Sequence, residues 1–235
     1  QITPAMVPHL GRAALPSIWA PDATIGTTEI WKDTTVAKGR ITVRGGGTLI
    51  ITNTTVEVGG VGGGGVGHIS VEPGGSMYIF NSTIRALDER YGGYTFFVVL
   101  AKNFVMKNSI VTQSGFSFQT DFPGGFSLLA TNATIENNTF THNYRGLWVS
   151  SQLGMVPAPP VVTIANNRIS YSYDGLVYDS GRVENNTVSK TVNTGIYAAE
   201  LFAHRPFLSG NKITDARMTG ITILGTYKIP VVNNV

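Results

Sequence analysis

Asp174 and Asp179 form a close pair of carboxylates in the repetitive part of the chain, with Glu184 further on. Two carboxylates held a few ångströms apart can act as acid and base in polysaccharide hydrolysis or elimination. The two residues lie five positions apart along an extended chain, so their side chains are expected on different faces. Asp174 and Asp179 are therefore catalytic candidates, and solvated loop acids are the alternative.

Histidine and cysteine, the usual ligands of transition metals, give no clear site. The four histidines His9, His68, His142 and His204 share no metal-ligand spacing. The chain has no cysteine, which excludes disulfides, thiolate metal sites and a cysteine nucleophile. No GxSxG elbow and no nucleotide-binding motif is present. We expect neither a metal nor another cofactor.

Aromatic residues gather between positions 144 and 197 and point to carbohydrate binding. Trp148 and Tyr197 each stand two residues after a recurring glycine, and Tyr144 and Tyr173 lie nearby in the sequence. Exposed aromatic rings in a row could stack on sugar rings. The same rings could instead pack beneath the loop at 150–160 or meet another subunit. We predict these four residues as ligand-binding and a polysaccharide as a candidate partner.

Asn-x-Ser/Thr sequons suggest N-glycosylation at five positions. Asn132 lies outside the repeat motif described below and is the best candidate. Asn53 and Asn81 coincide with a repeated turn position, where an inward side chain could not carry a glycan. A composition rich in Asn and Thr also produces sequons by chance. The candidate glycosylation sites are Asn53, Asn81, Asn132, Asn137 and Asn185.

An internal repeat must position these residues. The segments "GGTLIITNTTV" (46–56) and "GGSMYIFNSTI" (74–84) match position by position at an offset of 28 residues. A related pattern, aliphatic-x-Asn/Gly-Asn-x-apolar, recurs four times in the second half, and "VMKNSI" (105–110) links the two sets. The units align on the closing apolar residues Val56, Ile84, Ile110, Phe140, Ile169, Val188 and Ile213, at steps of 28, 26, 30, 29, 19 and 25 residues.

A period in the twenties, with short alternating strands and Asn or Gly corners, predicts a solenoid of about seven to eight coils. Strands of successive coils would pair in parallel about 4.8 Å apart. Asparagine tolerates the left-handed corner conformation, and its amide can hydrogen-bond to the asparagine of the next coil. Exposed turn residues are the alternative to such a ladder. The predicted ladder residues are Asn108, Asn138, Asn167, Asn186 and Asn211.

This pattern resembles the right-handed parallel β-helix family of pectate-lyase-like proteins, over about residues 40–235. It is most similar to the group that includes periplasmic copper-binding β-helix proteins and archaeal cell-surface proteins. The resemblance implies an all-β fold but no activity, because this fold supports lyases, hydrolases, adhesins and inert shafts. The hydrolases' paired aspartates and Arg-x-Lys signature are absent, and no His or Met cluster is present to hold copper.

The N-terminal part lies outside the repeat. We place residues 1–36 as a cap over the first coil or an arm that contacts a neighbouring subunit, and residues 37–235 as the β-helix. The glycine-rich stretch "EVGGVGGGGVGH" (57–68) lacks the lysine and the following helix of a phosphate loop. It fits within one 28-residue period, so we predict a coil turn or flattened strand that the N-terminal segment or another subunit can approach closely.

Composition suggests a location outside the cell. The chain is 42% hydrophobic and only 13% charged, with a formal net charge of +3. Its basic residues are scattered, which argues against nucleic acid, and no apolar stretch is long enough to span a membrane. The start at Gln1 suggests that a signal peptide has been removed, and a chain trimmed at this point is the alternative. We expect an extracellular structural or interaction protein that self-associates as a filament, lattice or adhesin subunit. A polysaccharide lyase, hydrolase or binding module is the alternative.

Overall fold

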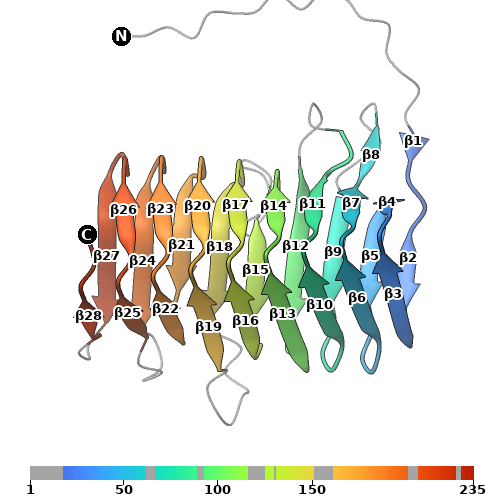
Figure 1. The fold of residues 1–235 in the computed structure, drawn as a ribbon, viewed down its shortest axis with the longest axis horizontal. Helices are drawn as coiled ribbons and strands as arrows, with labels where there is room; N and C mark the ends of the chain where they lie inside the picture. Colours follow the sequence, from blue (N-terminus) through green and yellow to red (C-terminus); the bar gives the residue numbers. More distant parts are fainter. Residues whose placement is uncertain are drawn as a thin grey trace, which may run out of the picture.

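The computed structural model describes residues 18–61, 67–88, 93–115, 125–129, 131–150, 161–200, 206–225 and 229–235. These residues form short strands arranged as a parallel β-solenoid (Figure 1). Within this part of the chain there is no helix, and hence none long and apolar enough to cross a membrane. The predicted all-β parallel solenoid is confirmed.

Three parallel sheets run the length of the solenoid, and each coil except the last contributes one strand to each sheet. Sheet 1 contains β2 (Ala23–Ile25), β5 (Arg40–Val43), β9 (Gly67–Val71), β12 (Tyr94–Val99), β15 (Phe126–Leu129), β18 (Arg145–Ser150), β21 (Asp174–Tyr178), β24 (Thr194–Glu200) and β27 (Thr219–Gly225). Sheet 2 contains β3 (Thr28–Lys32), β6 (Thr48–Thr52), β10 (Ser76–Phe80), β13 (Asn103–Lys107), β16 (Ala133–Glu136), β19 (Val162–Ala165), β22 (Arg182–Glu184), β25 (Phe207–Ser209) and β28 (Val231–Val232). Sheet 3 contains β4 (Thr35–Lys38), β7 (Thr55–Val58), β11 (Thr83–Ala86), β14 (Ile110–Thr112), β17 (Thr139–Thr141), β20 (Arg168–Ser170), β23 (Thr187–Ser189) and β26 (Lys212–Thr214).

We number the coils from coil 1 (β2, β3, β4) to coil 8 (β24, β25, β26), and β27 and β28 belong to coil 9. The coil count differs slightly from the predicted seven to eight. Sheets 2 and 3 face the viewer in Figure 1, and sheet 1 lies behind them.

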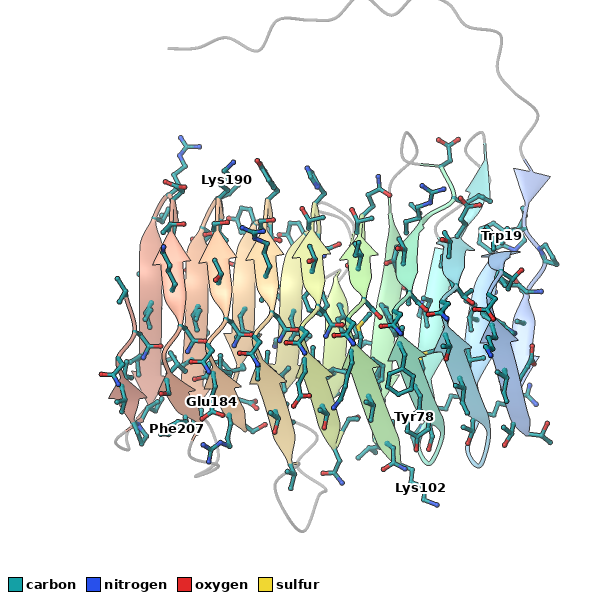
Figure 2. All side chains as sticks on the ribbon, viewed as in Figure 1. Trp19, Tyr78, Lys102, Glu184, Lys190 and Phe207 are labelled. Atoms are coloured by element: carbon teal, nitrogen blue, oxygen red, sulfur yellow. The ribbon has the colours of Figure 1, made fainter. Side chains whose placement is uncertain are left out.

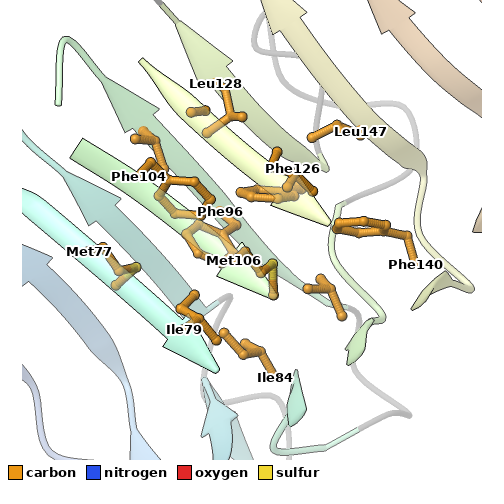
Figure 3. Packing of buried hydrophobic residues seen from close by; sticks show 14 of the residues in the cluster. Met77, Ile79, Ile84, Phe96, Phe104, Met106, Phe126, Leu128, Phe140 and Leu147 are labelled. Atoms are coloured by element: carbon orange, nitrogen blue, oxygen red, sulfur yellow. The ribbon is translucent and has the colours of Figure 1, made fainter. Parts of the chain in front are cut away.

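Alternation along each strand sends one set of side chains into a continuous apolar core. The core is richest in aromatic residues at coils 4 and 5, where Phe96, Phe104, Phe126 and Phe140 pack together (Figure 3). The ring centroids of Phe96 and Phe126 lie 4.4 Å apart, and those of Phe126 and Phe140 lie 5.7 Å apart. Ring contacts of this kind add to the free energy gained by burying the apolar surface.

A two-residue corner joins sheet 2 to sheet 3 in every coil. Its first residue is exposed and has a positive φ, as at Asn53 (50°), Asn137 (58°) and Asn185 (55°). Asparagine tolerates this left-handed conformation better than most residues. From coil 2 to coil 8 its second residue is buried, as at Asn138 and Asn186, whereas Thr34 of coil 1 is exposed. The "NN" pairs of the sequence therefore combine an exposed turn residue with a buried one.

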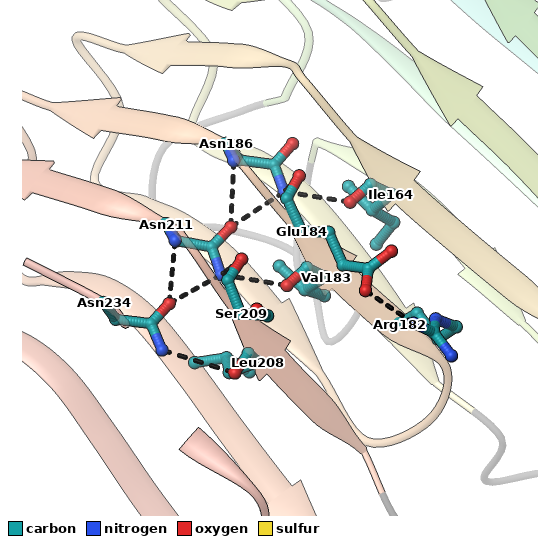
Figure 4. A network of polar contacts seen from close by, with 9 residues as sticks. All are labelled: Ile164, Arg182, Val183, Glu184, Asn186, Leu208, Ser209, Asn211 and Asn234. Carbon is teal, nitrogen blue, oxygen red and sulfur yellow. Dashed lines mark hydrogen bonds and ion pairs between the residues drawn. The ribbon is translucent and has the colours of Figure 1, made fainter. Parts of the chain in front are cut away.

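The inward residues form a hydrogen-bonded ladder along the solenoid. The side-chain Oδ1 of Asn186 accepts from the main-chain N of Asn167 at 2.9 Å and from its Nδ2 at 3.0 Å. Asn211 does the same for Asn186 at 3.0 Å each, and Asn234 accepts from Asn211 (Figure 4). In earlier coils hydroxyls take this position, since Ser82 accepts from the Thr54 main chain and Ser109 from that of Ser82.

Asn108 is not part of the ladder, contrary to the sequence prediction. It is exposed, has a φ of 54°, and occupies the first corner position. Ser109 is the inward residue, and its main-chain N donates to Asn138 Oδ1 at 2.9 Å. The predicted alignment on Ile110 was one residue out of register, because Val111 pairs with Ile84 and Phe140. A one-residue slip exchanges the two faces of a strand, and Ile110 is accordingly 43% exposed.

The solenoid begins before the predicted boundary at residue 37. Coil 1 consists of residues 23–38, and its strands pair in parallel with those of coil 2. Its corner uses Asp33, with a φ of 52°, so it lacks the asparagine by which the other coils are detected. The prediction of a cap or arm is therefore limited to the residues before coil 1, of which residues 1–17 lie outside the described part of the chain.

The glycine-rich stretch is approached by the segment that precedes coil 1. Strand β8 (Gly60–Val61) pairs in antiparallel fashion with β1 (Ile18–Trp19), with Trp19 opposite Gly60. The Trp19 indole also occupies the space where a Cβ on Gly39 would stand. The missing side chains thus allow β1 to lie close against the solenoid. Residues 62–66 of the stretch lie outside the described residues.

Candidate functional site

The outer face of sheet 1 in coils 6 to 8 brings together most of the predicted site residues. Trp148 of β18 pairs with Val177 of β21, which pairs with Tyr197 of β24. The three side chains therefore form one outward row, and Trp148 and Tyr197 are two strand spacings, about 9.6 Å, apart. The sequence places Trp148 and Tyr197 at the same position after a coil glycine, and in the structure they occupy the same position of their strands.

A cavity of about 210 Å³ lies along this row, and its lining includes Trp148, Val177 and Tyr197. Ser150 and Asp179 contribute polar groups to the lining. Both are buried, and Ser150 Oγ donates to Asp179 Oδ2 at 2.8 Å. The cavity therefore combines aromatic and aliphatic walls with a carboxylate and a hydroxyl, the mixture typical of small-molecule sites.

Tyr178 also borders the cavity and is buried. Its hydroxyl has no hydrogen-bond partner among the described residues. Burial raises the pKa of Tyr178 above its ordinary value, because the phenolate would lose its hydration. The phenol is therefore neutral at physiological pH and retains an unused donor.

A polar cluster flanks the aromatic row on the side nearest sheet 3. Arg145 Nε lies 3.6 Å from Asp174 Oδ2, and the Arg145 guanidinium lies 5.3 Å from the centroid of the Trp148 ring. Asn193 Nδ2 donates to Asp174 Oδ1 at 2.8 Å. Asp174 is thus held by two neighbours, and Arg145 is held against Trp148 by an ion pair and a cation–π contact. This cluster orients the indole of Trp148.

Asp174 and Asp179 do not form an acid–base pair. They lie at opposite ends of β21, with Asp174 its first residue and Asp179 directly after its last. Five residues of strand separate them by roughly 16 Å. Glycosidase carboxylates lie about 5–9.5 Å apart, so the two aspartates are too distant to act on one bond. The geometry gives each aspartate a separate task, one beside Arg145 and one in the cavity.

Tyr144 and Tyr173 stack on each other instead of forming an open platform. Their ring centroids lie 5.3 Å apart with an interplanar angle of 8°. A second stack, of His142 on Tyr171 at 4.9 Å, lies at the neighbouring corner. Because the facing ring surfaces are already in contact, Tyr144 and Tyr173 offer no room for a sugar between them. Their contribution is to hold successive coils together.

Histidines and acids do not assemble a metal site in the described part of the chain, where no group of three such residues converges. His68 lies on the outer face of sheet 1 beside Arg40 and contacts Thr95 through its Nδ1 atom. Burial lowers the pKa of His68, and the nearby Arg40 charge lowers it further. His9 and His204 lie outside the described residues.

All sequon asparagines are exposed. Asn53, Asn81, Asn137 and Asn185 occupy the first corner position, so their side chains point outward and the ladder residue follows each of them. Asn132 is exposed as well, but its Oδ1 already accepts from the Val161 main chain at 2.8 Å. The exposure of these side chains therefore gives no reason to prefer Asn132 over the four corner asparagines as a glycosylation site.

Arg145, Asn193 and Ser150 were not among the predicted site residues. Each is a common surface residue type, and its neighbours are one coil away, at sequence separations between 19 and 29. The alignment of the repeats would have placed Arg145 opposite Asp174, which was the available signal.

Comparison with known proteins agrees with the architecture. A family model described as "right handed beta helix region" matches residues 67–235. The chain has no significant match among curated proteins or solved structures. The family match covers more than half of the chain and coincides with a parallel solenoid of three sheets. The chain therefore belongs to the right-handed β-helix family.

Proposed function

We propose that this protein is an extracellular interaction protein of a cell surface, and that it binds carbohydrate on the outer face of sheet 1. The observation that carries the proposal is the row of Trp148, Val177 and Tyr197 over a cavity that contains Asp179 and Ser150. The exposed sequons and the low charge content agree with a place outside the cell.

The spacing of the row suits a linear glycan that crosses the strands. Consecutive sugars of an extended β-linked chain advance by nearly the spacing of one coil. Trp148 and Tyr197 would then stack on alternate sugars, while the smaller Val177 leaves room for the ring between them. Hydroxyl groups of that sugar would reach Asp179 and Ser150, which line the cavity. The Asp179 carboxylate can accept from sugar hydroxyls, and the Ser150 hydroxyl can both donate to and accept from them.

The proposal is for binding without bond cleavage. Asp174 is engaged by Arg145 and Asn193, and it lies roughly 16 Å along the strand from Asp179. A polysaccharide lyase or hydrolase at this face would need another pair of acid and base groups.

Trp148→Ala tests the proposal. The affinity for a glycan can be measured from the retention of the protein in native gels that each contain one polysaccharide. For the glycan that the wild type binds, the variant's affinity should be about 30-fold lower, as for the loss of a central aromatic contact in an interface. Tyr78→Ala is the matched control, because Tyr78 is a half-buried aromatic on the outer face of sheet 2 in coil 3 (Figure 2). Unchanged retention of the Trp148 variant, or an equal loss for the Tyr78 variant, would overturn the proposal.

Self-association is a second candidate function, favoured by coil 9. Strand β27 pairs with β24 on one side, and the side chains of Ile223 and Leu224 are 46% and 53% exposed. In the 235-residue chain, this edge of β27 and its exposed aliphatic side chains are suited to pairing with strands of another copy. Such head-to-tail contact between copies would build a fibre.

Solution scattering of the 235-residue chain tests this second candidate. The apparent mass should rise with concentration for the wild type and stay that of a monomer for Leu224→Lys, which adds a charge at the edge. Ile110→Lys is the matched control, because it adds the same charge at an aliphatic residue that is 43% exposed in coil 4, away from both end coils. Monomers at every concentration would rule out self-association.

A further inference from the structure

The outer face of sheet 3 between coils 4 and 8 carries a continuous row of hydroxyl groups. The third residues of its strands pair in register from β14 to β26. Ser170 Oγ donates to Thr141 Oγ1 at 3.3 Å, so neighbouring hydroxyls in the row approach each other. The row consists of Thr112, Thr141, Ser170, Ser189 and Thr214.

Cations stand beside this row in coils 6 and 8. Arg168 pairs with Thr187, and Thr187 pairs with Lys212, so the two cations lie on one line at a separation of about 9.6 Å. Both side chains are exposed, and within the described residues no ion pair involves either of them. The strands β14, β17, β20, β23 and β26 contain no acidic residue.

The corner beside sheet 3 adds one more cation and one acid. Lys190 follows β23, with its Nζ 2.5 Å from the Tyr171 hydroxyl and 4.6 Å from the centroid of that ring. Asp215 follows β26 and is exposed. Lys190 is therefore held in place by Tyr171, and the cations Arg168, Lys190 and Lys212 outnumber the one nearby carboxylate.

We propose that this face binds an acidic polysaccharide with an anionic group on every second sugar. The chain would run along the solenoid axis, with one sugar over each coil. Arg168 and Lys212 would each contact an anionic group, because they stand two coils apart. The hydroxyl row would bond the sugars' own hydroxyls, since Ser and Thr both donate and accept. Charge-assisted bonds from the cations would fix the register of the polymer.

The same surface is poorly suited to nucleic acid. Duplex DNA carries a charge about every 3.4 Å along each strand, much denser than these cations. Single strands are bound mainly through aromatic stacking. The one aromatic residue in these five strands, Phe140, is buried, and the exposed Tyr171 ring at the adjoining corner already stacks on His142 and contacts Lys190. A sparsely charged, hydroxyl-rich polymer matches the chemistry of the face better.

Sheet 3 and sheet 1 are different faces of the solenoid, so this inference does not depend on the proposed site at Trp148. The probe is a hyaluronate oligosaccharide of ten sugars, with dextran and single-stranded DNA as comparisons. Protein made without N-glycans is required, because Asn137 and Asn185 border the face. Binding is measured by isothermal titration at low ionic strength.

The double variant Arg168→Gln/Lys212→Gln should bind hyaluronate about tenfold more weakly, as expected for the loss of two surface ion pairs. The control Arg44→Gln/Lys102→Gln removes the same charge from exposed positions elsewhere and should bind as the wild type does. Figure 2 shows Lys102 and Lys190 at opposite edges of the solenoid. Trp148→Ala should leave hyaluronate binding unchanged.

The following results would overturn the inference. One is a double variant that binds hyaluronate as well as the wild type or the control variant does. Another is absence of hyaluronate binding, or dextran binding of equal strength. The third is equally tight binding of single-stranded DNA, which would indicate a general preference for polyanions. A change caused by Trp148→Ala alone would instead place hyaluronate on sheet 1.

Discussion

Replacing Asn186 by alanine should strongly destabilise the solenoid, because Asn186 is a central, fully buried member of the ladder. Its Oδ1 accepts from the main-chain N of Asn167 at 2.9 Å. Its Nδ2 donates to the Ile164 carbonyl at 2.9 Å (Figure 4). Alanine removes both interactions, together with the bonds to Asn167 Nδ2, the Glu184 carbonyl and Asn211 Oδ1. These last three groups each keep another hydrogen-bond partner, so the main loss falls on two main-chain groups, the Asn167 N–H and the Ile164 carbonyl.

The magnitude follows from those two groups. A buried donor or acceptor that loses its partner costs about 1–3 kcal/mol. Loss of the acceptor for the Asn167 N–H and of the donor to the Ile164 carbonyl therefore predicts about 2–6 kcal/mol for Asn186→Ala. That is a large share of the total stability of a domain. The free energy of unfolding of Asn186→Ser should lie between those of Asn186→Ala and the wild type, since Ser109 supplies a hydroxyl acceptor at the same position in coil 4.

Urea unfolding followed by far-ultraviolet circular dichroism measures the effect through the transition midpoint. Asn185→Gly is the matched control, because Asn185 is the exposed neighbour with a φ of 55° that glycine adopts readily. We expect its free energy of unfolding to change by less than about 0.5 kcal/mol. The ladder argument would be refuted if Asn186→Ala shifted the midpoint no more than Asn185→Gly does.

Three further predictions concern other parts of the solenoid. Gly175→Ala should lower the urea midpoint, because a Cβ there would collide with the carbonyl oxygen of the next coil; an unchanged midpoint would contradict this. The pKa of His68 measured by NMR should lie below 6.5, and it should rise in Arg40→Gln. The free energy of unfolding should therefore fall as the pH drops below 6.5, because the His68 imidazole binds a proton more readily in the unfolded chain. Gly39→Ala should displace the Trp19 indole and red-shift its fluorescence, with Trp19→Phe identifying that signal.

The corner chemistry could be predicted from sequence because it is local. An exposed left-handed residue followed by a buried polar residue needs only two adjacent positions, and Asn137–Asn138 and Asn185–Asn186 display both. Alternating short strands and Gly corners then indicate a parallel solenoid. The same reasoning failed at Asn108, because Ser109 replaces the second asparagine and the motif no longer marks its own register.

The first coil was missed for a similar reason. Asp33 takes the corner conformation without the asparagine signature, and Trp31 supplies the buried side chain of its strand. Coil 1 is established by the pairing of β3 with β6 over five residues, and no local sequence pattern predicts this pairing.

What the sequence determined by itself is the repeating coil: where the chain turns, which side chains enter the core, and that Asn can link one coil to the next. What only the tertiary structure decided is which residues meet across coils. Arg145 meets Asp174 at a separation of 29 residues, whereas Asn193 meets it at 19, because the coils differ in length. Those lengths set the register of each strand on its neighbour. The rows on sheets 1 and 3, and with them both proposed binding faces, exist only once that register is established.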